Sequence, residues 1–337
     1  VKRKRLRVTW TGCFFFFTKI LISQQTEGKP TTWQVSGVQT STRLARLGTN
    51  FQRSLEQRSC ACDRCLFEND TLAIERLRKF PQPFLSSNYS LPEEDFKWWR
   101  VIQRGGGTIS EYRRNMSRVF QLIPDNPPLE ASIPGRCRTC AVVGNSRNLL
   151  KSHYGPFIDF QDYVIRINRG RSKGFEADVG NRTTHHVMYL ESASQLDNTT
   201  RPVLFTFKMR DLEWITRVLS TQPSGKYSTI KTLYAPEVMV DKAMVLNPAF
   251  MRNIHQVWLQ KKGAYASTGF MALALALHIC DEVHVFGFGA DSDGNWSHYW
   301  DKVPNKKIKT GGHPGKVEYE MIEELASHQV LKFYKGW

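Results

Sequence analysis

The sequence predicts an α/β fold in which a mostly parallel sheet is covered by helices on both faces. Short β-branched runs alternate with longer helical patterns from residue 140 onward in the 337-residue chain. Such alternation is typical of strand-helix-strand units joined by right-handed crossovers. With 41% hydrophobic and 12% aromatic residues the chain can bury a substantial core. This composition excludes a disordered tail protein, a coiled coil and a multi-span membrane protein.

The expected elements follow one another in a regular order. The strands are expected at Ala141–Val143, Tyr163–Asn168, His185–Tyr189, Val203–Phe207 and Glu282–Phe288, and the helices at Leu212–Leu219, Pro248–Gln260 and Thr268–Ile279. Helix Thr268–Ile279 is apolar on all sides, which predicts that it is buried. Upstream, Trp98, Trp99 and a helical stretch from Tyr112 to Ile123 indicate an accessory layer packed on a larger core.

The N-terminal segment has the features of a membrane anchor. Five basic residues precede an apolar run from Val8 to Ile22, and such a flank keeps the N-terminus cytosolic and sends the rest of the chain into the lumen. The run is shorter than the roughly 20 residues of a full span and is interrupted by polar residues. We therefore expect a cytosolic tail and imperfect signal-anchor at 1–23, with a cleaved signal peptide or a solvated basic arm as the alternatives.

The rest of the chain divides by composition. Residues 24–59 are polar without sustained periodicity, which is typical of a stem. Residues 60–337 are expected to form the globular lumenal domain, with an accessory part at 60–134 and the sheet-bearing core at 135–337. No internal repeat is evident.

Sequons and cysteines agree with a lumenal address. Apart from Cys13 in the apolar run, six cysteines remain, an even number that can pair in an oxidising compartment. Zinc is the alternative, because Cys62 with Cys65 and Cys137 with Cys140 have ligand spacing. The formal charge of +16 favours anionic partners, and a lumenal chain does not meet genomic DNA. The candidate glycosylation sites are Asn69, Asn88, Asn115, Asn181, Asn198 and Asn295.

Loops that follow the expected strands are the candidate binding site, because ligands bind at the carboxyl ends of parallel strands. These loops contain Gly144-Asn145-Ser146, Asn168-Arg169-Gly170 and the segment 287–291. Their small residues admit a ligand to the backbone and their Asn side chains can bind a base or ribose, so a nucleotide is the natural ligand. Ser267-Thr268-Gly269 opens the buried helix and offers a phosphate site, with an ordinary N-cap as the alternative.

Two histidines are candidates for proton transfer. His298 and His313 lie in polar loop sequence, where an imidazole can accept a proton near neutral pH. Paired aspartates for a metal are not in position, and Asp291 and Asp293 are expected to serve a loop. The histidines on expected strands or helices are predicted to be packed, namely His185, His186, His255 and His278.

Four motifs in this order resemble those of the animal sialyltransferases. Residues 140–146, 163–168 and 174–180 resemble the large sialyl motif, and residues 247–250, 267–269, 280–283 and 287–291 resemble the small one. His298-Tyr299-Trp300 and the His313-x4-Glu318 element resemble the third and very small motifs. Residues 211–214 and the cluster of Cys60, Cys62 and Cys65 are most similar to the β-galactoside α-2,3-sialyltransferases acting on Gal-β-1,3-GalNAc.

The resemblance implies a GT-A-like variant with a Rossmann-like sheet that works without metal or another cofactor. It implies an inverting enzyme that moves sialic acid from CMP-sialic acid to the 3-OH of galactose. His313 would be the general base and His298 would contact the leaving phosphate. The expected residues that hold the acceptor or frame the site are Gln103, Tyr234 and Tyr265, and Tyr189 and Trp300 are further expected substrate-binding residues. The expected donor-binding residues are Asn145, Asn168, Ser267, Thr268, Gly269 and Gly289.

The resemblance also implies the disulfides Cys60–Cys65, Cys62–Cys137 and Cys140–Cys280. It implies a single-pass type II protein of the Golgi membrane with a lumenal catalytic domain at 60–337, which is also secreted if the stem is cleaved. The expected acceptors are O-glycans or glycolipids ending in Gal-β-1,3-GalNAc. The alternatives are a sialyltransferase of another acceptor or linkage and a catalytically silent, sialoside-binding relative. The chain departs from the family pattern at Ala266, Asp301, Pro314 and Gly315.

Overall fold

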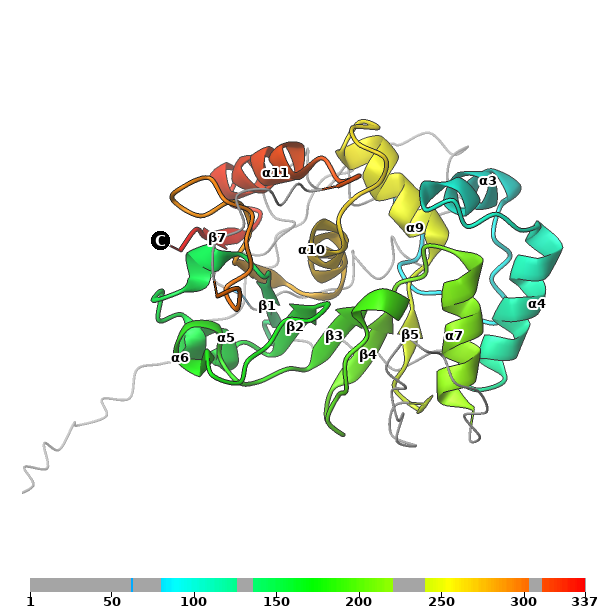
Figure 1. Cartoon of the computed structure of the whole chain (residues 1–337), viewed down its shortest axis with the longest axis horizontal. Coiled ribbons are helices and arrows are strands. Elements are labelled where there is room, and N and C mark those ends of the chain that lie inside the picture. The colour runs from blue at the N-terminus through cyan, green and yellow to red at the C-terminus, as the bar shows by residue number, and fades with distance from the viewer. Residues whose placement is uncertain (1–61, 63–79, 126–135, 221–239, 303–310, 337) are drawn as a thin grey trace, which may run out of the picture. The chain divides into compact units, whose positions relative to one another are not determined.

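The core of the structure is a single seven-stranded parallel sheet with the strand order β5-β4-β3-β2-β1-β6-β7 (Figure 1). The structure is a computed structural model that describes residues 62, 80–125, 136–220, 240–302 and 311–336. All of them belong to one folded unit, Gly48–Trp337. The predicted parallel sheet is confirmed. Its strands are β1 (Thr139–Val143), β2 (Tyr163–Ile167), β3 (His185–Met188), β4 (Arg201–Leu204), β5 (Met244–Val245), β6 (Glu282–Phe286) and β7 (Lys332–Tyr334).

The first two described helices precede β1, and the others occupy the connections between the strands. The helices are α3 (Glu93–Ile102), α4 (Ile109–Phe120), η1 (Arg147–Leu149), α5 (Gly155–Phe160), α6 (Glu176–Val179), η2 (Leu190–Ser192), α7 (Met209–Leu219), α9 (Pro248–Asn253), η3 (Ile254–Trp258), α10 (Thr268–Ile279) and α11 (Gly315–Ser327). Where one helix was predicted from Pro248 to Gln260, α9 gives way at Ile254 to a π-helical turn, η3. The sequence predicted the bounds of α10 correctly.

Side chains of the central strands alternate between two cores, as the twofold period of a strand requires. Cys140 and Val142 of β1 belong to the core beneath α10, whereas Ala141 and Val143 belong to the core shared with α5 and α6. Figure 1 shows α10 and α11 on one face of the sheet and α5 and α6 on the other. Both faces are therefore covered, which explains why the strands read as continuous apolar runs.

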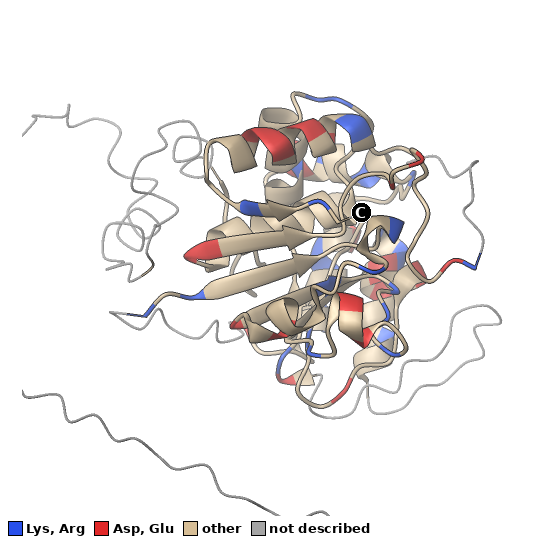
Figure 2. Ribbon diagram, turned by 90° about the vertical axis from the view of Figure 1, so that its left-hand side faces the viewer, with Lys and Arg blue, Asp and Glu red and all other residues tan. Residues whose placement is uncertain are grey.

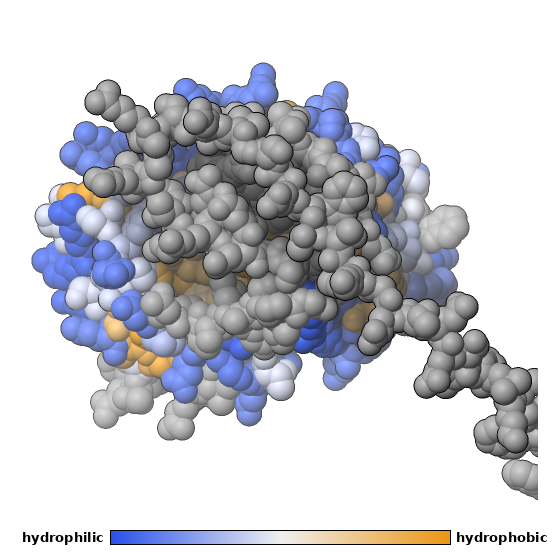
Figure 3. Space-filling view, turned by 180° about the vertical axis from the view of Figure 1, so that it is seen from behind, coloured by the Kyte–Doolittle hydropathy of each residue, from blue (hydrophilic) through white to orange (hydrophobic). Residues whose placement is uncertain are grey.

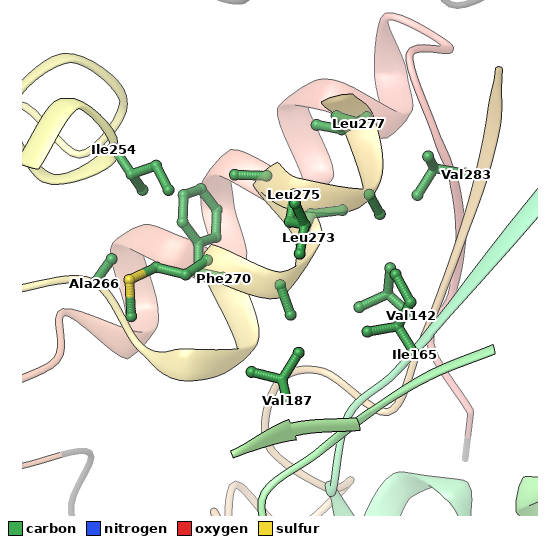
Figure 4. Packing of buried hydrophobic residues seen from close by; sticks show 14 of the residues in the cluster. Val142, Ile165, Val187, Ile254, Ala266, Phe270, Leu273, Leu275, Leu277 and Val283 are labelled. Carbon is green, nitrogen blue, oxygen red and sulfur yellow. The ribbon is translucent and has the colours of Figure 1, made fainter. Parts of the chain in front are cut away.

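Helix α10 is the centre of the larger core. All of its residues except Gly269 are buried, and the helix lies against strands β1, β2, β3 and β6. Phe270, Leu273 and Leu277 belong to the same cluster as the sheet residues Val142 and Val187 (Figure 4). A helix at the surface carries a polar face toward solvent. Because α10 is buried on all sides, its sequence has no such face.

The described part of the region 60–134 contributes helices α3 and α4, which pack on the sheet-bearing core. Thr108 caps α4 through a capping box with Glu111, and α4 contacts α7 while α3 contacts α9. The indole N–H of Trp99 donates to the carbonyl oxygen of Thr206 at 2.6 Å. This bond and the burial of Trp99 fix the accessory helices to the loop that follows β4.

Two of the three expected disulfides are present. Cys62 is bonded to Cys137, and Cys140 on β1 is bonded to Cys280, the C-cap residue of α10. The second bond fastens the C-terminus of the buried helix to the central strand. Cys60 and Cys65 lie outside the described residues, so their expected pairing stays a prediction.

Polar groups cover the outside of this fold. Acidic positions follow helix α11 in Figure 2, where Lys316 pairs with Glu320 at 3.7 Å. In the view from behind, the coloured part of the surface is mostly hydrophilic with small apolar areas (Figure 3). Within the described ranges, no helix has the length and apolar character needed to cross a membrane. The expected anchor at 1–23 and stem at 24–59 lie outside those ranges.

Candidate active site

A cavity of about 400 Å³ opens at the carboxyl ends of the central strands. Its walls come from the segments that directly follow β1, β2, β3 and β6, beginning at Gly144, Asn168, Tyr189 and Gly287 respectively. Strand β1 has β2 on one side and β6 on the other, so the strand order reverses there. Ligands bind at such a switch point in open parallel sheets. The predicted location of the site in these loops matches the cavity.

Two asparagines that line the cavity have buried amide oxygens without a hydrogen-bond partner among the described residues. The Nδ2 group of Asn145 donates to the carbonyl oxygen of Ile167 at 3.1 Å. The backbone of Asn168 has a left-handed φ of 56°, and its N–H donates to the carbonyl oxygen of Val187 at 2.7 Å. Among the described residues, neither Oδ1 atom has a hydrogen-bond partner, although both are buried. Buried acceptors of this kind call for a donor, which a ribose hydroxyl or base amino group would supply.

The first turn of α10 forms another wall. Ser267 caps the helix by accepting a hydrogen bond from the N–H of Phe270 at 3.1 Å. Thr268 and Gly269 follow it along the cavity. An α-helix leaves its first N–H groups without intrahelical partners and carries partial positive charge there, so this wall suits a phosphate.

Glu318 ties this turn to helix α11. Its Oε1 accepts a hydrogen bond from the backbone N–H of Ser267 at 2.6 Å. Burial raises the pKa of the Glu318 carboxyl, while the hydrogen bonds from Ser267 oppose the shift. Sequence reasoning assigned this residue no role beyond its place in a motif. The structure shows that it joins the first turns of α10 and α11.

His313 lies on the cavity wall just before α11. Its imidazole meets the ring of Tyr265 edge-on, with 4.9 Å between ring centroids. Burial lowers the pKa of His313, although a hydrogen bond with the backbone of Tyr265 opposes the shift. The lowered pKa favours the neutral ring, which is the state a general base requires.

His298 lines another part of the same cavity. Its ring stacks on Trp300 with 4.6 Å between centroids, and its Nδ1 lies 3.3 Å from Oδ2 of Asp301. Asp301 also accepts from the backbone N–H of His298 at 2.8 Å. Trp300 is not among the residues that line the cavity, and it supports the imidazole of His298 by stacking on it.

Gln103 and Tyr265 lie beside the cavity and join it to a charged cluster. The Nε2 group of Gln103 donates to the hydroxyl of Tyr265 at 3.2 Å, and Lys208 Nζ donates to Oε1 of Gln103 at 3.2 Å. Lys208 pairs with Glu191 at 2.8 Å and with Asp211 at 3.4 Å. Burial raises the pKa of Asp211 to about 6. Sequence reasoning missed Lys208 and Glu191, because single charges at loop ends carry no recognisable pattern.

The loop after β6 is shaped by backbone constraints. Gly289 has a φ of 90°, and a Cβ there would collide with the ring of Tyr319. Asp291 accepts from the N–H groups of Asp293 at 3.1 Å and Asn295 at 2.8 Å, so it serves the loop as predicted. Within the part of the chain that the structure describes, no three His, Cys, Asp or Glu side chains gather to hold a metal ion.

Several predicted residues fall elsewhere. Tyr234 and Asn69 lie outside the described residues. Asn295 was a glycosylation candidate, but it is only 7% exposed and its side chain donates to Asp291, so this fold leaves no room for a glycan there. Asn115 is half-buried, and the sequon asparagines that are exposed are Asn88, Asn181 and Asn198.

A nucleotide-sized cavity that combines a helix N-terminus with two imidazoles defines a candidate group-transfer site. Comparison with known proteins gives the family. Residues 84–330 match glycosyltransferase family 29 (sialyltransferase), and the chain belongs to this family.

Curated relatives and solved structures agree. CMP-N-acetylneuraminate-beta-galactosamide-alpha-2,3-sialyltransferase 1 of Mus musculus is 38% identical over 351 residues, covering 100% of both chains. The corresponding sialyltransferase 2 of Mus musculus is 39% identical over 301 residues, covering 87% of this chain and 84% of the relative. A crystal structure of a mammalian sialyltransferase superposes with a TM-score of 0.74 at 40% identity, covering 83% of this chain and 100% of that one. Another, with a TM-score of 0.73 and 39% identity, is a complex with Gal-beta-1-3GalNAc-ortho-nitrophenol and covers 82% of this chain and 100% of that one.

Proposed function

We propose that this sialyltransferase moves sialic acid from CMP-sialic acid to the 3-OH of terminal galactose in Gal-β-1,3-GalNAc, with inversion at the anomeric carbon. The observation that carries the proposal is the meeting, in one cavity, of two buried amide oxygens, the N-terminus of α10 and two imidazoles. The acceptor and linkage are supported by the names of the relatives and by the disaccharide derivative bound in one related crystal structure.

The donor carries two negative charges, one on its carboxylate and one on its phosphodiester. The cavity offers hydrogen-bond acceptors for the nucleoside and a helix N-terminus for the phosphate. Asn145 and Asn168 accept hydrogen bonds from the ribose or cytosine, while the N–H groups at Thr268 and Gly269 face the phosphate. Because the helix N-terminus supplies positive potential, we propose that transfer needs no metal ion. A chelator then leaves the rate unchanged.

Transfer joins the acceptor oxygen O3 to the anomeric carbon of sialic acid as the bond from that carbon to the CMP phosphate oxygen breaks. His313 takes the proton from O3, and CMP leaves with the bonding electrons. A positioned imidazole contributes about 10²- to 10⁴-fold to such a step. His298 donates a hydrogen bond from its imidazole to the departing phosphate and stabilises its growing charge.

The acceptor is proposed to approach along Gln103 and Tyr265. Tyr265 contacts the ring of His313, so a sugar held by the Tyr265 hydroxyl would place its own hydroxyl beside the base. Tyr189 also lines the cavity and packs against Phe207, which contacts Tyr265 in turn.

Cell location and processing complete the proposal. We propose a type II protein of the Golgi membrane with its anchor at 1–23, its stem at 24–59 and its lumenal catalytic domain at 60–337. The third disulfide is proposed to be Cys60–Cys65. Glycans are proposed on the exposed sequons Asn88, Asn181 and Asn198 and not on Asn295.

The decisive assay offers CMP-sialic acid with Gal-β-1,3-GalNAc and, separately, Gal-β-1,4-GlcNAc, with and without a chelator. We expect CMP release and α-2,3-linked product on the first disaccharide in both conditions. A product of another linkage, or preference for the second disaccharide, contradicts the acceptor assignment. Binding of CMP without any product on either disaccharide identifies a silent relative.

A further inference from the structure

We propose that His255 is a positioning residue for the loop that carries His313, acting through the carbonyl group of Gly263. This inference rests on the proposed role of His313 as the base. His255 lies in the π-helical turn η3 and is only 8% exposed. The sequence predicted a packed histidine, but its two ring nitrogens are both engaged in specific bonds.

The partners of the ring fix its tautomer. The indole N–H of Trp98 donates to Nδ1 of His255 at 3.3 Å, and Nε2 lies 3.1 Å from the carbonyl oxygen of Gly263. An indole can only donate and a carbonyl can only accept. The neutral ring with its proton on Nε2 is therefore the form that satisfies both contacts.

The chain between His255 and Gly263 is folded back to make this contact. Gln260 and Lys261 have left-handed φ values of 48° and 62°, and the N–H of Lys261 donates to the carbonyl oxygen of His255 at 2.9 Å. The π-helical turn η3 contains an i to i+5 hydrogen bond, in which the N–H of Leu259 donates to the carbonyl oxygen of Ile254 at 3.1 Å. Such π-helical turns occur frequently at functional sites.

Gly263 in turn lies against the loop that carries His313. Its φ is +66°, and a Cβ built on it would lie 2.6 Å from Cδ of Pro314 and 2.9 Å from the carbonyl oxygen of Gly312. The next residue, Ala264, donates its N–H to that same carbonyl at 2.8 Å. The residues on both sides of His313 therefore rest on the segment that His255 holds.

A continuous path thus runs from Trp98 of α3 through His255 and Gly263 to His313. A base displaced by about 1 Å can cost up to about 100-fold in rate. We expect loss of the His255 bond to lower kcat while the donor site, formed by β1, β2 and α10, keeps its affinity. A role in core stability alone would lower the amount of folded enzyme and leave kcat per folded molecule unchanged.

The test compares His255→Phe, which keeps a ring and removes both bonds, with His255→Gln, whose amide can still donate to Gly263. We expect at least about a tenfold loss of kcat in His255→Phe, an unchanged KM for CMP-sialic acid, and partial rescue in His255→Gln. His278→Phe is the matched control, because His278 is similarly buried but packs between Phe80 and Phe250. Wild-type kcat per folded molecule in His255→Phe overturns the proposal.

Further variants guard against failure to fold and separate the two hypotheses. Gly263→Ala, which drives a Cβ into Pro314, is expected to lower kcat with the same unchanged donor KM, and a normal kcat there also overturns the proposal. If His313→Ala retains transfer, the base assignment fails whatever His255 does. If His313→Ala is inactive while His255→Phe and Gly263→Ala are normal, only the positioning role fails.

Discussion

His313 is suited to act as a base because of where its ring lies. Partial burial lowers the pKa of the imidazole, and the edge contact with Tyr265 holds the ring against the cavity. His298 differs, since its side chain is 43% exposed and pairs with Asp301. The two imidazoles are therefore held in environments that favour different roles, one as proton acceptor and one as phosphate partner.

Replacement of the proposed base gives the first prediction. His313→Ala is expected to abolish transfer, because it removes the imidazole that takes the proton from the acceptor hydroxyl. CMP binding is expected to persist, since the donor contacts lie on β1, β2 and α10. The measurements are CMP release in the presence of acceptor and calorimetric CMP affinity. His328→Ala, at the exposed end of α11, should keep full activity.

The pH dependence of kcat/KM gives the second prediction. A base with a lowered pKa stays active below its usual 6.5 and loses activity only as it becomes protonated, so we expect an acid limb with an apparent pKa below 6.5. Asp211, with a pKa of about 6, could produce a limb in the same range through Lys208 and Gln103. The limb should survive in Asp211→Asn, and its disappearance there would assign it to the acceptor cluster.

At the scale of elements, the site depends on the contact between the N-terminal turns of α10 and α11. The Glu318 carboxylate accepts the N–H of Ser267, and this bond sets the first turn of one helix against the first turn of the other. This contact between residues about 50 positions apart therefore links the phosphate wall to the helix that directly follows the His313 loop.

Removal of that contact is the third prediction. Glu318→Ala leaves a buried N–H without its acceptor, which is expected to lower the free energy of unfolding by about 1–3 kcal/mol and to weaken CMP binding. Glu318→Gln keeps an oxygen acceptor and is expected to lose less. Glu320→Ala, on the exposed side of the same helix, should change stability by less than about 0.5 kcal/mol. Equal losses in the alanine and glutamine variants would show that the hydrogen bond is not responsible.

Elements differ in how far the sequence predicts them. Helix α10 was predicted because an unbroken apolar run from Phe270 to Leu277 follows the capping residue Ser267. Strands β5 and β7 were missed because two and three residues carry no period. The π-helical turn at 254–258 was taken as α-helix, since side-chain patterns do not distinguish the two hydrogen-bond registers.

The candidate site was predicted in outline from the strand ends. Asn145, Asn168, Ser267 and His313 do line one cavity, because the loops after parallel strands converge at one edge of the sheet. Lys208 and the path through His255 could not be predicted, because they depend on contacts between residues more than 100 positions apart, from Gln103 to Lys208 and from Trp98 to His255.

At the scale of the whole molecule, buried histidines make the fold sensitive to acid. Burial lowers the pKa of His185 to about 3 and that of His186 to about 4, from 6.5. Between those values the unfolded chain binds more protons than the folded one, so stability is full above pH 6.5 and falls as the pH drops. Each histidine is expected to lower the free energy of unfolding by about 2 kcal/mol when the pH falls from 7 to 5.

Urea unfolding at these two pH values tests this fourth prediction. The variant His185→Gln should lose about 2 kcal/mol less than the wild type over the same interval. His328→Gln, at an exposed position, should follow the wild type. If His185→Gln shows the same pH dependence as the wild type, the acid sensitivity arises elsewhere, for example from the carboxylates with lowered pKa such as Asp162.

Catalysis in this protein is proposed to depend on two features together, the N-terminus of α10 that binds the nucleotide phosphate and a neutral His313 that faces the acceptor hydroxyl. A crystal structure of the chain with CMP and Gal-β-1,3-GalNAc tests this pairing most directly. We expect the phosphate beside Thr268 and Gly269, and the galactose 3-OH within hydrogen-bonding distance of a ring nitrogen of His313. A nucleotide bound away from that helix, or an acceptor hydroxyl that meets a different side chain, would contradict it.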